Sequence, residues 1–172
     1  MNNLKQLHTF FRFGYVKLEN FYDERRKSML VKDLMTKEIV CASTEDTVFQ
    51  VAKMMKIHNI GCVPVVANDE KVLGVVTDRD IVLSIAKNNV NTGKTLASSI
   101  MSEKVYSVRP GADVEDALQL MKLQKIRRLP VIENDRIMGM ISFGDVAASN
   151  DFRAQIGDTI SEISSPARPK NL

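Results

Sequence analysis

Two short stretches of the sequence combine a glycine, a hydroxyl residue and an aspartate at the same spacing. They are Gly74, Thr77 and Asp80, and Gly139, Ser142 and Asp145. If a helix starts after the hydroxyl residue, the carboxylate lies one turn later on the same side. The carboxylate could accept from both ribose hydroxyls, the hydroxyl could reach a phosphate, and a helix N-terminus favours an anion. The spacing therefore indicates a site for a nucleoside phosphate.

The same spacing also has a purely structural interpretation. A Ser or Thr followed three residues later by an acidic residue is a capping box, which does no more than start a helix. One copy alone favours helix capping. The second copy, again preceded by a glycine and an apolar run, shifts the balance towards binding, and both interpretations stay open.

Both stretches belong to a longer internal repeat. A shift of 66 residues places Met35 on Met101, and a shift of 65 after a one-residue deletion places Gly74 on Gly139. Each copy predicts a short strand at 39–41 or 105–108, a helix with apolar residues at i, i+3, i+4 and i+7, a hairpin, and a closing helix. The closing helices are expected to begin at 78 and 143. The predicted unit is β-α-β-β-α.

One unit of about 55 residues cannot cover its own sheet face, so we expect an α+β fold in which the two repeats pack sheet to sheet as a pseudo-two-fold pair. The predicted organisation divides the 172 residues into an N-terminal extension, the first repeat, a linker, the second repeat, and a short helix around 154–163 with its tail. Their bounds are 1–28, 29–88, 89–95, 96–150 and 151–172.

The first 28 residues differ in composition from the rest. They hold six of the ten aromatic residues and six Lys/Arg against three Asp/Glu. Three interpretations stay open: a basic aromatic helix on a membrane surface or partner, a helix packed on the repeats, or a translated leader before Met29. The leader hypothesis rests on residues 24–28, which a ribosome-binding sequence could encode. No signal peptide is apparent, so export is not expected.

The remaining composition excludes several classes of protein. Residues 29–172 carry eighteen charges of each sign, so no nucleic-acid partner is expected. No apolar run is long enough to span a bilayer. Cys41 and Cys62 lack metal-site or disulfide spacing. The sequence offers neither a nucleophile with its general base nor a cluster of metal ligands. We therefore expect no enzymatic activity and no catalytic cofactor. These features predict a cytoplasmic protein.

Residues 30–150 resemble a tandem CBS pair, the Bateman module, of the small free-standing bacterial type. The motifs that carry the resemblance are Val31-Lys32-Asp33-Leu34-Met35-Thr36, Ile60-Gly61-Cys62-Val63-Pro64-Val65, Gly74-Val75-Val76-Thr77-Asp78-Arg79-Asp80, Ile126-Arg127-Arg128-Leu129-Pro130-Val131 and Gly139-Met140-Ile141-Ser142-Phe143-Gly144-Asp145. The resemblance implies an adenine nucleotide as regulatory ligand, an unknown regulated protein, and a homodimer formed through the helices. The ligand could be AMP, ADP, ATP, S-adenosylmethionine or a cyclic dinucleotide.

Two unequal clefts are expected. Arginines at 127 and 128 suit a phosphate, and strand alternation lets only one of them face a cleft squarely. With the resemblance, this predicts a strong site and a weak site. The strong site comprises Val40, Ile60, Gly61, Arg127, Arg128, Met140, Ser142 and Asp145. The weak site comprises Tyr106, Ile126, Val75, Thr77 and Asp80. The alternative is a protein-interaction or nucleic-acid-binding module with empty clefts.

Overall fold

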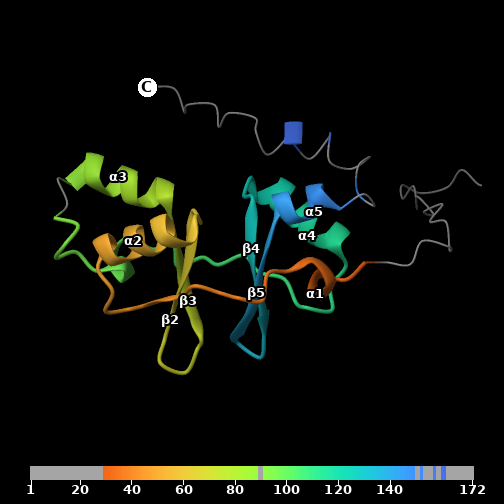
Figure 1. Ribbon diagram of the computed structural model, residues 1–172, viewed down its shortest axis with the longest axis horizontal. Coiled ribbons are helices and arrows are strands. Elements are labelled where there is room, and N and C mark those ends of the chain that lie inside the picture. The colour runs from red at the N-terminus through yellow and green to blue at the C-terminus, as the bar shows by residue number, and fades with distance from the viewer. Residues whose placement is uncertain (1–28, 89–90, 150–151, 153–156, 158–159, 162–172) are drawn as a thin grey trace, which may run out of the picture.

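The computed structural model describes residues 29–88, 91–149, 152, 157, 160 and 161. The expectations for residues 1–28 lie outside the described residues, as does most of the tail helix expected around 154–163. The described chain has the predicted α+β architecture, in which two similar repeats lie side by side (Figure 1). No helix within these ranges is long and apolar enough to cross a membrane.

The first repeat follows the predicted order of elements. They are β1 (Ala42–Ser43), α2 (Val48–His58), β2 (Cys62–Val66), β3 (Val72–Thr77) and α3 (Asp78–Asn88). The Thr47 hydroxyl accepts from the Gln50 amide at 3.3 Å and starts α2. The helix ends at Asn59, whose φ of 52° is left-handed. β1 pairs in parallel with β2, and β2 pairs antiparallel with β3.

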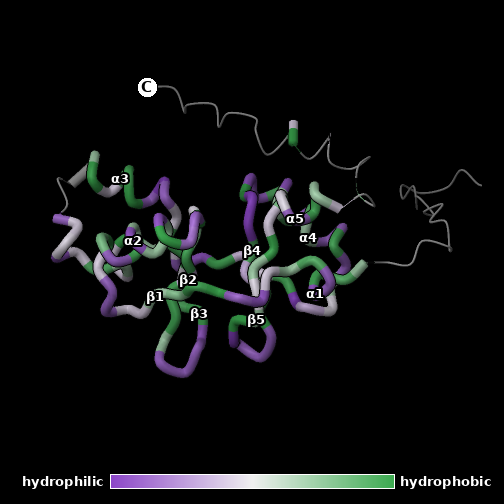
Figure 2. The backbone as a smooth tube through the Cα atoms, in the orientation of Figure 1, coloured by the Kyte–Doolittle hydropathy of each residue, from purple (hydrophilic) through white to green (hydrophobic). Residues whose placement is uncertain are grey.

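The second repeat consists of α4 (Val114–Gln124), β4 (Arg128–Glu133), β5 (Arg136–Ser142) and α5 (Phe143–Ala148). Strands β4 and β5 form the predicted antiparallel hairpin. Its turn is Asn134-Asp135, and both residues have positive φ, 51° and 65°. Asn and Asp tolerate this conformation, which two-residue hairpin turns require. The hydrophilic turns of both hairpins project from the same side of the molecule (Figure 2).

The first strand of each repeat is shorter than predicted. β1 begins at Ala42 instead of residue 39, and the strand expected at 105–108 is reduced to a bridge between Val108 and Val131. Proline explains both differences, because it has no amide to donate. The parallel bridge uses the bond from Ile132 N to Val108 O, and the next bond upstream would need an amide from Pro130. Pro64 limits the start of β1 in the same way.

The leading segment of each repeat packs on the other repeat. Helix α1 (Val31–Leu34) lies against the second repeat (Figure 1), where the Val31 amide donates to the Ala112 carbonyl at 2.9 Å. The 3₁₀ helix η1 (Ala97–Ser99) lies against the first repeat, where the Ala97 amide donates to the Asp46 carbonyl at 2.7 Å. This exchange, together with a bridge between Lys71 and Arg136, joins the two repeats.

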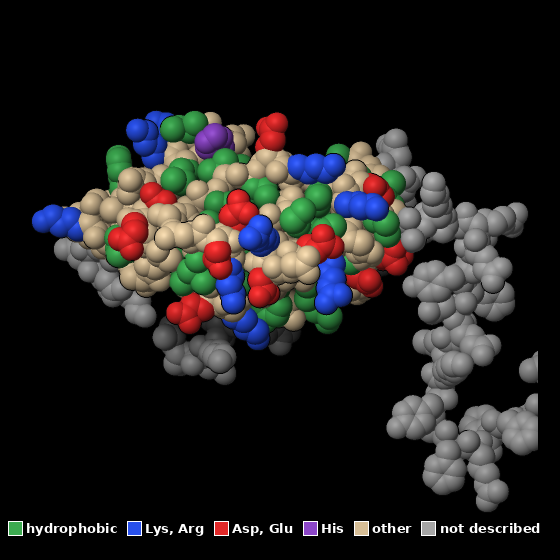
Figure 3. Space-filling view, turned by 90° about the horizontal axis from the view of Figure 1, so that it is seen from below, with side chains coloured by type: hydrophobic (Ala, Val, Ile, Leu, Met, Phe, Trp, Pro, Cys, Tyr) green, Lys and Arg blue, Asp and Glu red, His purple; other side chains and the backbone are tan. Residues whose placement is uncertain are grey.

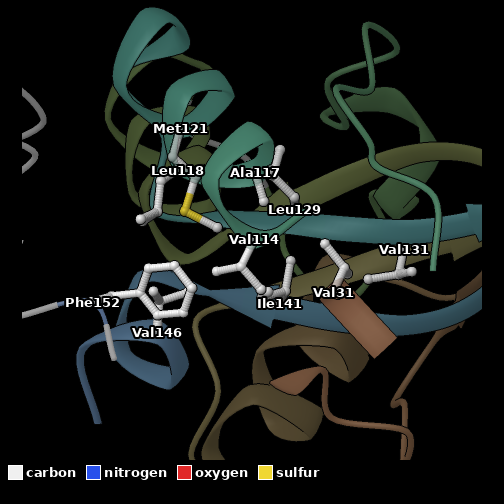
Figure 4. Packing of buried hydrophobic residues seen from close by; sticks show 10 residues of the cluster. All are labelled: Val31, Val114, Ala117, Leu118, Met121, Leu129, Val131, Ile141, Val146 and Phe152. Atoms are coloured by element: carbon white, nitrogen blue, oxygen red, sulfur yellow. The ribbon is translucent and has the colours of Figure 1, made fainter. Parts of the chain in front are cut away.

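Each repeat has its own hydrophobic core. In the second repeat, one stripe of α4 faces β4 and β5, as its helical periodicity predicts. Val31 from the crossing segment completes this core (Figure 4). The buried residues of this cluster are Val31, Val114, Ala117, Leu118, Met121, Leu129, Val131, Ile141, Val146 and Phe152. The two cores hold the hairpins in fixed positions, and this positions the cleft described next.

Candidate functional site

A cavity of about 640 Å³ lies where the two repeats meet. Its walls come from the segment before β1, the end of α2, the start of β4, and the junction of β5 with α5. The crossing of the leading segment brings these elements together. Thr36 and Met140, which both line the cavity, also pair with each other as an isolated bridge. The volume lies within the range of small-molecule sites.

Most of the predicted strong site lines this one cavity. Its lining includes Val40, Ile60, Arg128, Met140, Ser142 and Asp145. Arg127 does not line it, and its carbonyl accepts from the Phe143 amide at 2.8 Å. Strand alternation turns the neighbouring Arg128 into the cavity, so only one of the two arginines reaches it.

Gly61, the other predicted residue outside the lining, lies directly beside the cavity. A Cβ built on Gly61 would be 2.8 Å from Asp78 Oδ2 and 3.7 Å from Arg128 Nη1. A larger residue would therefore have to displace the Asp78 carboxylate. We infer that Gly61 leaves room for these two side chains and makes no wall of its own.

Ser142 and Asp145 form a complete capping box at the start of α5. The Ser142 hydroxyl and amide both donate to Asp145 Oδ2 at 2.7 Å, and the Asp145 amide donates back to Ser142 Oγ at 3.2 Å. The structural interpretation of the motif is therefore confirmed. Asp145 nevertheless lines the cavity, so its binding role stays a prediction.

Comparison with known proteins decides the family. The sequence model of the CBS domain matches residues 31–87 and 97–149. The chain belongs to the CBS-domain family. The CBS domain-containing protein YhcV of Bacillus subtilis is 37% identical over 135 residues, which cover 78% of this chain and 94% of that protein.

Solved structures of CBS-domain proteins share the fold. The CBS domain pair of protein MJ0100, in complex with 5′-methylthioadenosine and S-adenosyl-L-methionine, matches with a TM-score of 0.65 at 26% identity. The match covers 76% of this chain and 98% of that one. The hexameric CBS-CP12 protein from bloom-forming cyanobacteria matches with a TM-score of 0.66 at 27% identity, covering 74% of this chain and 71% of that one.

The predicted weak site does not coincide with the second cavity of this CBS pair. That cavity, of about 490 Å³, is lined by 107–109 and 132–135, and it contains none of the five predicted residues. Thr77 and Asp80 form the second capping box, with a bond of 2.7 Å from hydroxyl to carboxylate. The Lys104 ammonium lies 5.0 Å from the centre of the Tyr106 ring and occupies a ring face.

The other two members of the predicted weak site lie apart, with Val75 at a contact between the two CBS repeats and Ile126 within the second. Val75 exchanges backbone hydrogen bonds of 3.1 and 2.9 Å with Ser102, and Ile126 packs against the core of the second repeat. The weak site stays a prediction.

Several residues that line the cavity were not predicted from the sequence. They are Thr36, Glu38, Ile39, His58, Asn59, Cys62 and Ile141. Asn59 could have been found, because an asparagine that ends a helix in the left-handed conformation directs the chain into the next element. Thr36 could not, because its place depends on the leading segment crossing to the other CBS repeat.

The Cys62 thiol is held in its protonated form. Burial raises the pKa of Cys62 to about 11, and the carboxylates of Asp80 and Asp78 act in the same direction against the opposing charge of Arg128. Because the thiolate is the nucleophile and the metal ligand, this thiol is unreactive at neutral pH. Within the described ranges, no group of three His, Cys, Asp or Glu side chains is placed to bind a metal ion.

Proposed function

We propose that this CBS pair is a regulatory module that binds an adenine nucleotide in the cavity between its repeats. The observation that carries the proposal is the convergence of the Asp145 carboxylate and the Arg128 guanidinium on a cavity that also has apolar side chains in its lining. Apolar walls with a few polar groups are typical of ligand sites. The adenosine-containing ligands in the MJ0100 structure support the same class of ligand.

Different side chains of the lining would bind the base, the ribose and the phosphate. Val40 and Ile60 provide apolar surface for the adenine ring. Asp145 uses Oδ2 in its capping box, which leaves Oδ1 to accept hydrogen bonds from ribose hydroxyls. Arg128 provides the positive charge for a phosphate.

Binding would regulate by changing how the repeats sit against each other. The cavity is lined by Thr36 and Met140, whose backbone pairing joins the first repeat's leading segment to β5. A ligand that favours one arrangement of this joint shifts the equilibrium only by its differential affinity. We propose no catalytic step, and a cytoplasmic location stays a prediction.

A second copy of this chain is the proposed protein partner. The first repeat exposes large apolar side chains on α2 and α3, including Phe49 at 58%, Ile57 at 64% and Val82 at 63% exposure. A homodimer would cover them. Nucleic acid is a poor fit, because Lys/Arg and Asp/Glu side chains are interspersed on the face in Figure 3 and form no basic band.

A thermal-shift panel tests the ligand. Adenosine, AMP, ADP, ATP and S-adenosylmethionine are each titrated against the full chain. A ligand at about 100 times its dissociation constant adds roughly 2.7 kcal/mol, which raises the melting temperature by about 5 to 10 °C for this size. Guanosine and GMP serve as controls and should shift it less. No shift with any adenine compound would contradict the proposal.

A further inference from the structure

We infer that the cavity selects adenosine ligands with little negative charge, and that Glu38 is the residue that sets this selectivity. The inference rests on the proposed function, because it names the ligand class of the same cavity. The lining carries two carboxylates, Glu38 and Asp145, and one guanidinium, Arg128. Among these three side chains the negative charges exceed the positive by one, so each added phosphate meets repulsion.

The hydrogen-bond donors at the start of α5 are largely engaged already. The Ser142 hydroxyl and amide donate to Asp145, and the Phe143 amide donates to the Arg127 carbonyl at 2.8 Å. The Asp145 amide donates to Ser142. A phosphate could use these donors only by breaking these hydrogen bonds, which leaves Arg128 as its main binding group in this cavity.

The charge of Arg128 is itself partly offset. Asp78 Oδ2 and Arg128 Nη1 lie 2.8 and 3.7 Å from the same point beside Gly61, so a carboxylate shares the surroundings of the guanidinium. A carboxylate close to the guanidinium reduces the attraction that Arg128 exerts on a ligand anion. The partly offset charge of Arg128 is sufficient for a nucleoside or a monophosphate. A triphosphate brings several negative charges, and the cavity has too few positive groups to pair with them.

Glu38 is the lining residue at which this balance can be reversed. Its side chain is exposed at the cavity mouth, and the 66-residue repeat offset places Lys104 at the equivalent position of the second repeat. Glu38→Lys therefore gives the first repeat the residue that the second repeat carries. The change turns an excess negative charge into an excess positive one without touching the capping box.

Isothermal titration calorimetry of the full chain with adenosine, AMP and ATP at low salt tests the inference. The wild-type chain should bind ATP at least tenfold more weakly than AMP. Glu38→Lys should strengthen ATP binding about tenfold and should change the affinity for uncharged adenosine much less. This gain should shrink at high salt, because Glu38 is exposed and its field is screened.

Glu45→Lys is the matched control. Glu45 is also exposed, but it does not line the cavity, so the same change of charge there should leave the preference for AMP intact. Equal affinity for AMP and ATP in the wild-type chain, or equal gains from both substitutions, would overturn the inference and leave the proposed function standing. Failure of all three compounds to bind would overturn the proposed function itself.

Discussion

Thr36 and Met140 join the two repeats at the cavity through two backbone hydrogen bonds. The Thr36 amide donates to the Met140 carbonyl at 2.8 Å, and the Met140 amide donates to the Thr36 carbonyl at 3.0 Å. Both residues line the cavity, so a ligand bound there would contact the joint directly. Under the proposed function, ligand binding would therefore act on the arrangement of the repeats.

Gly139→Ala should destabilise the joint. A Cβ on Gly139 would lie 2.8 Å from Met35 Sδ and 2.9 Å from the Thr36 carbonyl, which cannot move without breaking its pairing. Overpacking of this kind costs about 1 to 3 kcal/mol of unfolding free energy, measurable by urea denaturation. Gly111→Ala is the control, because a Cβ there meets nothing within 4 Å. Equal losses from the two substitutions would contradict the crossing arrangement.

Alkaline pH should remove stability that depends on Cys62. The folded state raises the pKa of this thiol from 9.0 to about 11, so the folded state holds the proton more tightly than the unfolded state. The stabilisation is fully present below pH 9 and is lost as the pH rises to 11. Two pKa units correspond to about 2 to 3 kcal/mol.

The measurement is the unfolding free energy against pH for the wild-type chain and Cys62→Ala. The variant should lose less stability between pH 9 and 11. Cys41→Ala is the comparison, because burial also raises the pKa of the Cys41 thiol. If the unfolding free energies of the wild-type chain and Cys62→Ala fall equally between pH 9 and 11, the Cys62 thiol is not the source of the lost stability.

The proposed homodimer should depend on the helices of the first repeat. Sedimentation of the wild-type chain should give twice the 19.3 kDa mass of one chain. Ile57→Glu places a charge on α2 where the side chain is 64% exposed, and it should yield monomers. Leu123→Glu on α4, 73% exposed, should leave the dimer intact. A monomeric wild-type chain would contradict the interface.

The sequence predicted the features that depend on local pattern. The α4 stripe, the hairpin turns at 68–70 and 134–135, and the start of α5 follow from periodicity, turn chemistry and capping, and all three appear in the structure. The prediction of a strand at 105–108 was wrong, because the length of this strand depends on its pairing with β4, which Pro130 limits. The strand propensity of a segment cannot show which backbone amides its partner strand must supply for pairing.

The site was predicted in part for the same reason. Arg128 and Asp145 lie in motifs that predict their place at the cavity, whereas Thr36 and Glu38 reach it only because their segment crosses to the other repeat. Sequence reasoning also assigned the Ser142 hydroxyl to a phosphate, but its proton is donated to Asp145 in the structure. Such competition between capping and binding becomes visible only with distances.

Calorimetric titration of AMP into the chain with Asp145→Asn tests the central claim most directly. The asparagine carbonyl keeps the capping bonds but loses the charge, so AMP should bind about ten- to a hundredfold more weakly, a loss of about 1.5 to 3 kcal/mol. Asp80→Asn, the same change in the other capping box, should have a much smaller effect. An Asp145→Asn dissociation constant equal to that of the wild-type chain would contradict the account.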